Sequence, residues 1–226
     1  VTTFAGELEG AATDLAEAGL RGASEEARRI LKNVQRGMHP SALEADARTI
    51  GHRIIKELSS RRFLRVRNAC SSYVDNDELF GPVVAKRFRS AKSDIREAGN
   101  CLAADCNSAA VFHLMRVSEH GLRAVAKRLR VRLNHKGGNH PVEYADWNKV
   151  ITGIRNKLTE LRSKSPGKRK EKALMFYSDI ADQSEYIKDI WRNRISHARH
   201  SYDADEAMRV KQRVHDFMVR LAAGPV

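Results

Sequence analysis

Apolar residues recur at helical spacing along most of this 226-residue chain, and this periodicity constrains the fold more than any other feature. Between positions 203 and 222, apolar side chains three or four residues apart line one face of a helix: Ala207, Val210, Val214, Phe217, Met218 and Leu221. Alternating runs typical of strands are absent, apart from segment 63–66, which is a candidate strand or extended linker. The sequence therefore predicts an all-α fold.

A break in the periodicity between Tyr73 and Pro82 divides the chain, because turn-forming residues gather there. Residues 1–72 are predicted to be an N-terminal helical extension, and residues 83–226 a helical domain of ordinary size. We expect the second part to fold as an antiparallel helical bundle. Its predicted helices cover 90–102, 107–129, 146–162, about 172–191 and 203–222, and its two basic loops cover 130–141 and 163–170.

Positive charge is concentrated in the middle of the chain. The 41 Lys and Arg residues against 28 Asp and Glu residues give a net charge of +13. Segment 120–172 alone holds fifteen basic and four acidic residues, a balance of +11. This concentration favours a polyanionic partner over general solubility, the alternative being a solvated basic face. The residues predicted to contact nucleic acid are Lys164, Lys168, Arg169, Lys170 and Arg194.

Other patterns exclude several classes of protein. No apolar run approaches eighteen residues, so no membrane association is expected, and the first residues lack the pattern of a signal peptide, which predicts a cytoplasmic location. The three cysteines lack CxxC spacing and are interpreted as buried free thiols. His197 and His200 have no third ligand at suitable spacing, so neither a metal site nor another cofactor is expected.

The segment Trp191 to His197 carries the chemistry, because it places Arg192 five residues before His197. An arginine can hold a phosphate through two parallel contacts, and a histidine can move protons near neutral pH. Cleavage of RNA without a metal needs a base, an acid and a cation that stabilises the phosphorane. In an ideal helix Asn193 shares a face with His197, so we predict that Asn193 orients the imidazole. Arg192, Asn193 and His197 are therefore the predicted catalytic residues.

One imidazole cannot serve as base and acid in the same step. A symmetric homodimer would bring two copies of the motif to one cleft. The sequence therefore predicts a homodimer as well as an RNA partner.

The pattern of an Arg, an adjacent Asn and a His, with four to six residues between the Arg and the His, resembles the HEPN family of helical ribonucleases and nucleotide-binding domains. Residues Ala109–Glu119 resemble that family's second helix, and the helix after Tyr202 resembles its last. The resemblance covers about residues 90–222. It implies a dimeric, metal-independent endoribonuclease, acting as a toxin of a toxin–antitoxin pair or as an antiviral defence effector. It also implies an antitoxin or another regulatory protein as a partner.

Several alternatives remain open. Arg194 and His200 also satisfy the spacing, and His200 with Tyr202 resembles the His-x-Tyr extension of some family toxins. Basic residues near a helix end can simply interact with the helix dipole and carbonyls. The alternative functions are a non-catalytic RNA- or nucleotide-binding module of the same fold, and an interaction protein in which residues 1–72 bind a partner.

Overall fold

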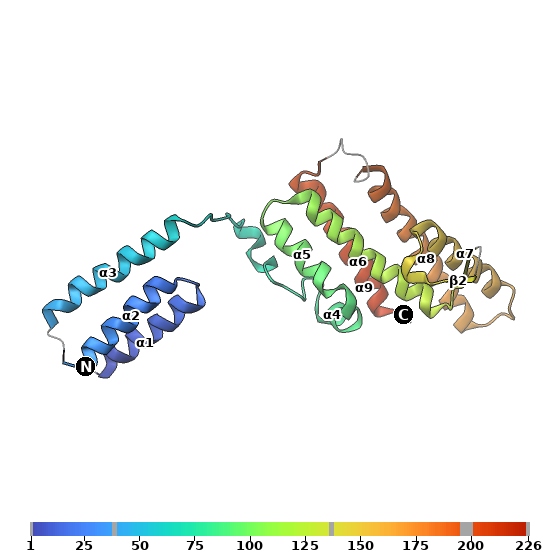
Figure 1. Cartoon of the computed structure of the whole chain (residues 1–226). Helices are drawn as coiled ribbons and strands as arrows, with labels where there is room; N and C mark the ends of the chain where they lie inside the picture. Colours follow the sequence, from blue (N-terminus) through green and yellow to red (C-terminus); the bar gives the residue numbers. More distant parts are fainter. Residues whose placement is uncertain (1, 38–39, 136–137, 195–200, 225–226) are drawn as a thin grey trace. The chain divides into compact units, whose positions relative to one another are not determined.

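The computed structural model describes residues 2–37, 40–135, 138–194 and 201–224, and the chain divides into two units, Val1–Leu64 and Arg65–Val226. The fold is all-α, as the apolar periodicity predicts (Figure 1). In the described residues the only strands are two of three residues each, β1 (Leu133–His135) and β2 (Gly138–His140), which pair antiparallel.

The described residues of the first unit form three helices, α1 (Thr2–Glu17), α2 (Arg21–Gln35) and α3 (Pro40–Ser59). A small cluster formed by Leu8, Ile30 and Val34 lies between α1 and α2, with Leu31 and Ile50 packed against it. Polar contacts also join the helices, two of them from the start of α2. Ser24 Oγ donates to the Ala12 carbonyl at 2.6 Å, and the Ala23 N–H donates to Glu57 Oε1 at 2.7 Å.

The second unit contains the main core, which is organised around one helix. Its longer helices are α5 (Lys92–Ala103), α6 (Asn107–Arg128), α7 (Trp147–Arg162), α8 (Lys168–Arg194) and α9 (Ala204–Ala223). Three short elements, η1 (Asn68–Tyr73), α4 (Pro82–Arg87) and η2 (Arg89–Ala91), precede α5, and η3 (Val142–Tyr144) precedes α7. Helix α6 contacts α5, α7, α8 and α9 (Figure 1). Several of its apolar side chains are fully buried, among them Val111, Leu114, Leu122 and Val125.

Two neighbouring helices of this bundle, α6 and α9, begin at the same end. The start of α9 lies at the start of α6, where the Tyr202 N–H donates to Ser108 Oγ at 3.1 Å. Further along, a Cβ atom on Gly121 would lie 2.6 Å from Leu221 Cδ1 and 2.8 Å from Met218 Sδ. The two helices are therefore parallel, and the missing side chain of Gly121 allows their close approach.

The structure differs from the sequence interpretation at two boundaries. The units divide after residue 64, because Arg67 donates its backbone N–H to Ala103 and its guanidinium to Leu102, which attaches segment 65–72 to α5. Helix α8 begins at Lys168 rather than near 172. Segment 63–66 forms no strand, and the first basic loop contains the β1–β2 pair, which its Gly137-Gly138 sequence did not reveal.

In the described part of the chain, no helix combines the length and the apolar character needed to cross a membrane.

Replacing Gly121 by alanine tests the close packing of α6 on α9. The added Cβ would meet Leu221, Met218 and Phe217 within 3.1 Å, so the free energy of unfolding should fall by about 1–3 kcal/mol. Gly51→Ala in α3 is the matched control, because nothing lies within 4 Å of its added Cβ and alanine favours a helix. Urea unfolding measures both variants. Equal stability of Gly121→Ala and the parent protein would contradict this packing.

Candidate functional site

The catalytic motif predicted from the sequence begins in the last turn of α8. Arg192, Asn193 and Arg194 belong to that helix. His197 and His200 lie outside the described residues, and so does the expected alignment of Asn193 with His197. The structure therefore places the start of the motif at the C-terminal end of α8 and leaves its catalytic geometry as a prediction.

Shortly after the motif, the side chain of Tyr202 is buried in the core. Tyr202 is 5% exposed and belongs to the main core, and its N–H donates to Ser108 at the start of α6. The next residue, Asp203, begins α9 through a capping box with Glu206, which follows the Asp-x-x-Glu pattern in the sequence. The C-terminal end of α8 is thus linked by eight residues to the end of the bundle where α6 and α9 begin. Tyr202 also belongs to the alternative motif of Arg194, His200 and Tyr202, and it lies in the main core.

The predicted nucleic-acid-binding residues do not gather at the motif. Lys164 lies in the connection after α7, and Lys168, Arg169 and Lys170 form the first turn of α8. Arg192 is 24 residues further along the same helix, which corresponds to about 36 Å at a rise of 1.5 Å per residue. Only Arg194, of the five predicted contact residues, shares an end of α8 with the catalytic motif.

One of these basic side chains has a structural role. Lys170 Nζ donates to the Arg162 carbonyl at 2.7 Å and also to the Lys164 carbonyl, so it caps the C-terminal end of α7. By contrast, the side chains of Lys164, Lys168 and Arg169 are exposed and show no hydrogen bond or ion pair within the described residues. These three are therefore free to contact an external anion.

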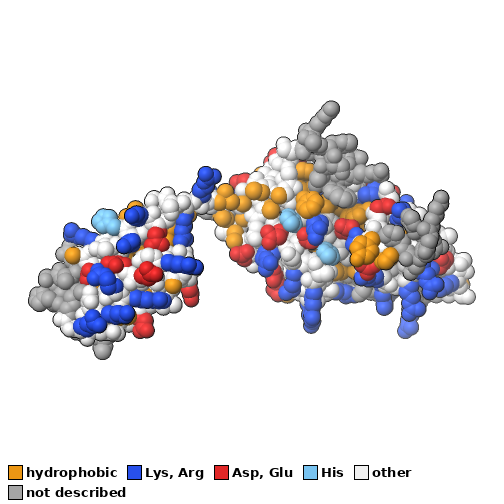
Figure 2. Space-filling view, in the orientation of Figure 1, with side chains coloured by type: hydrophobic (Ala, Val, Ile, Leu, Met, Phe, Trp, Pro, Cys, Tyr) orange, Lys and Arg blue, Asp and Glu red, His pale blue; other side chains and the backbone are white. Residues whose placement is uncertain are grey.

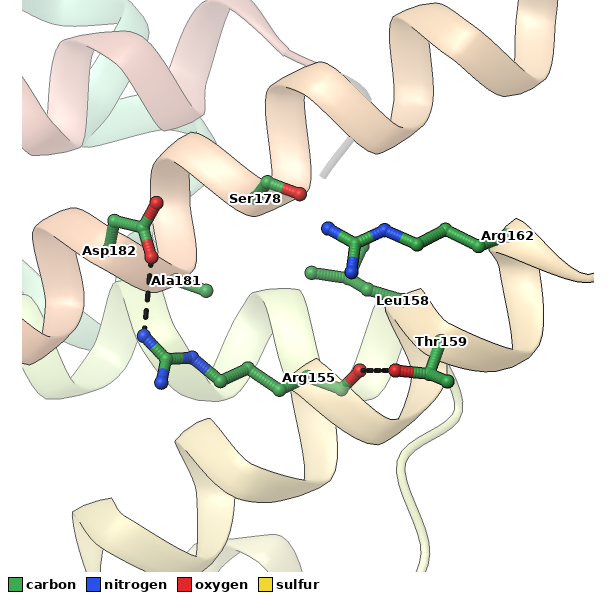
Figure 3. A pocket seen from close by; sticks show the side chains of 7 residues that line it. All are labelled: Arg155, Leu158, Thr159, Arg162, Ser178, Ala181 and Asp182. Carbon is green, nitrogen blue, oxygen red and sulfur yellow. Dashed lines mark hydrogen bonds and ion pairs between the residues drawn. The ribbon is translucent and has the colours of Figure 1, made fainter.

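A pocket of about 370 Å³ lies between α7 and α8, which the sequence interpretation did not identify (Figure 3). Arg155 and Arg162 project into it from α7, opposite Ser178 and Asp182 on α8. Arg155 Nη2 lies 3.2 Å from Asp182 Oδ1 and also pairs with Glu185. The charge of Arg155 is therefore already neutralised. In the sequence, the seven-residue spacing of Arg155 and Arg162 places both side chains on one helix face and could have indicated this pocket.

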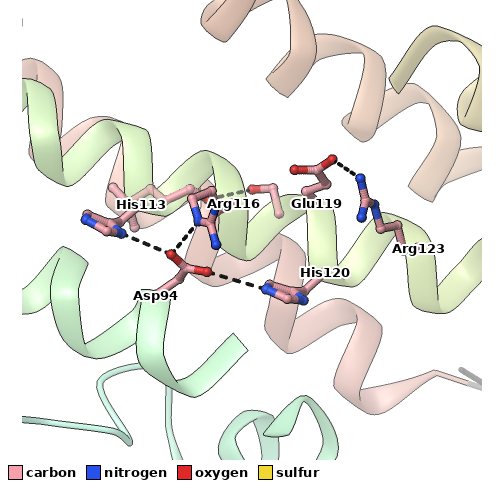
Figure 4. A network of polar contacts seen from close by, with 8 residues as sticks. Asp94, His113, Arg116, Glu119, His120 and Arg123 are labelled. Atoms are coloured by element: carbon pink, nitrogen blue, oxygen red, sulfur yellow. Dashed lines mark hydrogen bonds and ion pairs between the residues drawn. The ribbon is translucent and has the colours of Figure 1, made fainter. Parts of the chain in front are cut away.

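A second polar cluster joins α5 to α6 through one buried carboxylate (Figure 4). Asp94, which is 6% exposed, lies 2.7 Å from Arg116 Nε, 3.0 Å from His113 Nδ1 and 3.4 Å from His120 Nε2. The seven-residue spacing of the two histidines places them on one face of α6. Both rings here contact Asp94, so the histidines share a structural carboxylate.

The protonation of Asp94 follows from this environment. Burial raises the pKa of Asp94, but the hydrogen bonds from Arg116 and His113 outweigh it and lower the pKa below its ordinary value. The Arg116 pKa rises in turn, chiefly because of its hydrogen bond to Asp94. Asp94 is therefore held as a carboxylate at neutral pH and fastens two histidines and an arginine of α6 to α5.

The cysteines differ from the interpretation as buried thiols. Cys70 is buried, Cys101 is half-buried and Cys106 is exposed at the start of α6, and all three are free. Burial raises the pKa of Cys101, which disfavours its thiolate. Within the described ranges, no three His, Cys, Asp or Glu side chains are arranged to hold a metal ion.

The comparisons with known proteins found no match to this chain among family models, curated proteins or solved structures.

Replacing Asp94 by asparagine tests the α5–α6 cluster. It removes the charge-assisted bond to Arg116, so the free energy of unfolding at pH 7 should fall by about 1.5–3 kcal/mol. Asp216→Asn is the control, because the Asp216 side chain is 64% exposed, and it should change stability by less than about 0.5 kcal/mol. Equal effects of the two variants would contradict the role of Asp94.

The same cluster predicts a pH dependence. Because the folded pKa of Asp94 lies below the ordinary value of 3.8, its contribution is complete above that value and is lost as the pH falls through the folded pKa. The difference in unfolding free energy between the parent protein and Asp94→Asn should therefore shrink as the pH falls below about 4. A difference that grows as the pH falls below about 4 would contradict this.

Proposed function

We propose that this protein is a metal-independent endoribonuclease of the HEPN type, whose catalytic residues are Arg192, Asn193 and His197. The observation that carries the proposal is the position of Arg192 and Asn193 in the last turn of α8, followed by a short connection to the buried anchor Tyr202. An Arg-Asn pair at a helix end, followed within ten residues by a buried side chain, is a suitable support for a histidine that must meet a phosphate.

The proposed reaction is an internal transesterification. The ribose 2′-oxygen attacks phosphorus, its proton passes to a base, and the bond from phosphorus to the 5′-oxygen breaks as that oxygen receives a proton from an acid. His197 supplies the base or the acid, and Arg192 stabilises the charge on the phosphorane oxygens. A homodimer supplies the second imidazole. The biological role that we propose is a toxin or antiviral defence effector, controlled by an antitoxin or another regulatory protein.

The basic end of α8 has a separate role in this proposal. Lys168 and Arg169 lie about 36 Å from Arg192 along α8, too far to contact the same phosphate. They would hold another part of the RNA, which adds affinity without changing the chemical step. The same charges support the second candidate, a non-catalytic RNA-binding module, because binding of this kind needs no intact motif.

Cleavage by matched variants separates the two candidates. Purified parent protein should cleave single-stranded RNA, and His197→Ala and Arg192→Ala should each lower the rate by at least about 100-fold, the size of one acid–base or charge-stabilising contribution. Arg209→Ala is the control, because Arg209 is exposed on α9 and its side chain has no partner among the described residues. Intact RNA with the parent protein, or equal cleavage by His197→Ala, would contradict the nuclease and leave the binding module.

The salt dependence of binding tests the basic end of α8. Removing two phosphate contacts with Lys168→Ala and Arg169→Ala should weaken single-stranded RNA binding and reduce the slope of log affinity against log salt by about 1.4. Asn193→Ala should leave that slope unchanged, since it removes no charge. Fluorescence anisotropy with a 2′-O-methyl oligonucleotide measures both, because that RNA lacks the attacking hydroxyl. An unchanged slope in the double variant would contradict phosphate contacts at this end.

A further inference from the structure

The turn that joins α5 to α6 has the geometry of a Schellman motif. The Cys106 N–H donates to the Cys101 carbonyl at 2.9 Å, and the Ala104 N–H donates to the Asn100 carbonyl at 3.0 Å. Asp105, just before Cys106, has a φ of 58°, which lies in the left-handed region. A backbone hydrogen bond that spans six residues and encloses a left-handed residue is the characteristic feature of this helix end.

This motif brings two cysteines to the same turn. Its first and sixth residues, whose side chains commonly make a hydrophobic contact, are here Cys101 and Cys106. Cys106 Sγ turns back over the end of α5, where it lies 3.6 Å from the Ala104 carbonyl oxygen. Burial raises the pKa of Cys101 most, and the neighbouring Cys106 raises it further, which agrees with their proximity.

The exposure of the thiols gives them different roles. Cys106 is exposed and Cys101 is half-buried, whereas Cys70 is 3% exposed. A solute in water therefore reaches Cys106 first, and the thiol beside it in the turn is that of Cys101. An accessible cysteine next to a second one is the arrangement that redox-sensitive thiols use.

Arg67 holds this turn from outside. Its Nε lies 2.9 Å from Asp105 Oδ1, and its Nη2 donates to the Leu102 carbonyl at 2.9 Å. Both contacts attach to residues that lie between the two cysteines in the sequence. The turn therefore keeps the two thiols near each other, which favours a reaction between them over a reaction with a second chain.

We propose that Cys101 and Cys106 form a site of reversible oxidation by hydroperoxides. The Cys106 sulfur attacks one oxygen of hydrogen peroxide, the O–O bond breaks, and the products are a sulfenic acid and a molecule of water. The Cys101 sulfur then attacks the Cys106 sulfur and displaces its hydroxyl group as a second molecule of water. The two thiols thus lose two hydrogen atoms and form a disulfide, while the peroxide is reduced to water.

The disulfide ties the end of α5 covalently to the start of α6. This site is separate from the proposed nuclease motif and does not depend on it.

Counting the free thiols of the full chain tests the proposal. The untreated protein should show three thiols after denaturation, and the protein treated with hydrogen peroxide should show one. Dithiothreitol should restore all three, because thiols reduce a disulfide but not a sulfinic or sulfonic acid. Cys70→Ser is the control, and its count should fall from two to none. Thermal melting of each variant verifies that it is folded.

Peptide mapping locates the bond. Trypsin, followed by a protease that cleaves before aspartate, separates residues 97–104 from residues 105–116, so that each peptide carries one cysteine. In the oxidised protein a disulfide should hold these two peptides together.

Serine variants test the order of the two steps. In Cys101→Ser, peroxide should leave a sulfenic acid on Cys106, which dimedone traps. In Cys106→Ser, both remaining thiols should stay free. Three free thiols in the treated parent protein, a bond between two chains, a bond to Cys70, or equal loss of thiols in Cys106→Ser and the parent protein would overturn the proposal.

Discussion

The structure of the second unit depends on the burial of α6 against four other helices. Its fully buried side chains, such as Leu114 and Leu122, face the core, and Gly121 permits α9 to approach closely. Asp94 fastens α5 to the polar side of the same helix through Arg116 and two histidines. Helix α9 begins beside the start of α6, where the Tyr202 N–H donates to Ser108.

The predicted catalytic residues Arg192 and Asn193 and the exposed cations of α8 lie at opposite ends of that helix. Helix α8 carries Arg192 at one end and the exposed cations Lys168 and Arg169 at the other, about 36 Å apart. The 27-residue helix α8 separates these two regions. In our account, the basic end adds affinity for RNA and the motif performs the chemical step.

Much of the helical architecture could be predicted from local signals. The apolar spacing in 203–222 and the capping box at Asp203 match α9, and the limits of α6 and α7 agree within a residue. The start of α8 was missed, because Lys168 and Arg169 resemble a solvated loop and their cationic charge is unfavourable at a helix N-terminus. Segment 65–72 was assigned to the extension because its attachment depends on a long-range contact, from Arg67 to the end of α5.

The candidate site was less predictable because its contacts, too, join residues that are far apart in the sequence. The capping of α7 by Lys170 and the sharing of Asp94 by His113 and His120 are tertiary contacts that sequence spacing does not specify. The spacing of the histidines indicated a common face but not their shared partner. The proposed roles of Arg192, Asn193 and His197 rest on the sequence motif and on the helix end that carries it.

The chemical form of the RNA ends after cleavage in EDTA tests the central claim most directly. Metal-free attack by the 2′-oxygen predicts fragments with a 2′,3′-cyclic phosphate at one end and a 5′-hydroxyl at the other, and mass spectrometry identifies both. Fragments with a 5′-phosphate and a 3′-hydroxyl, or cleavage that stops when EDTA is added, would contradict the account.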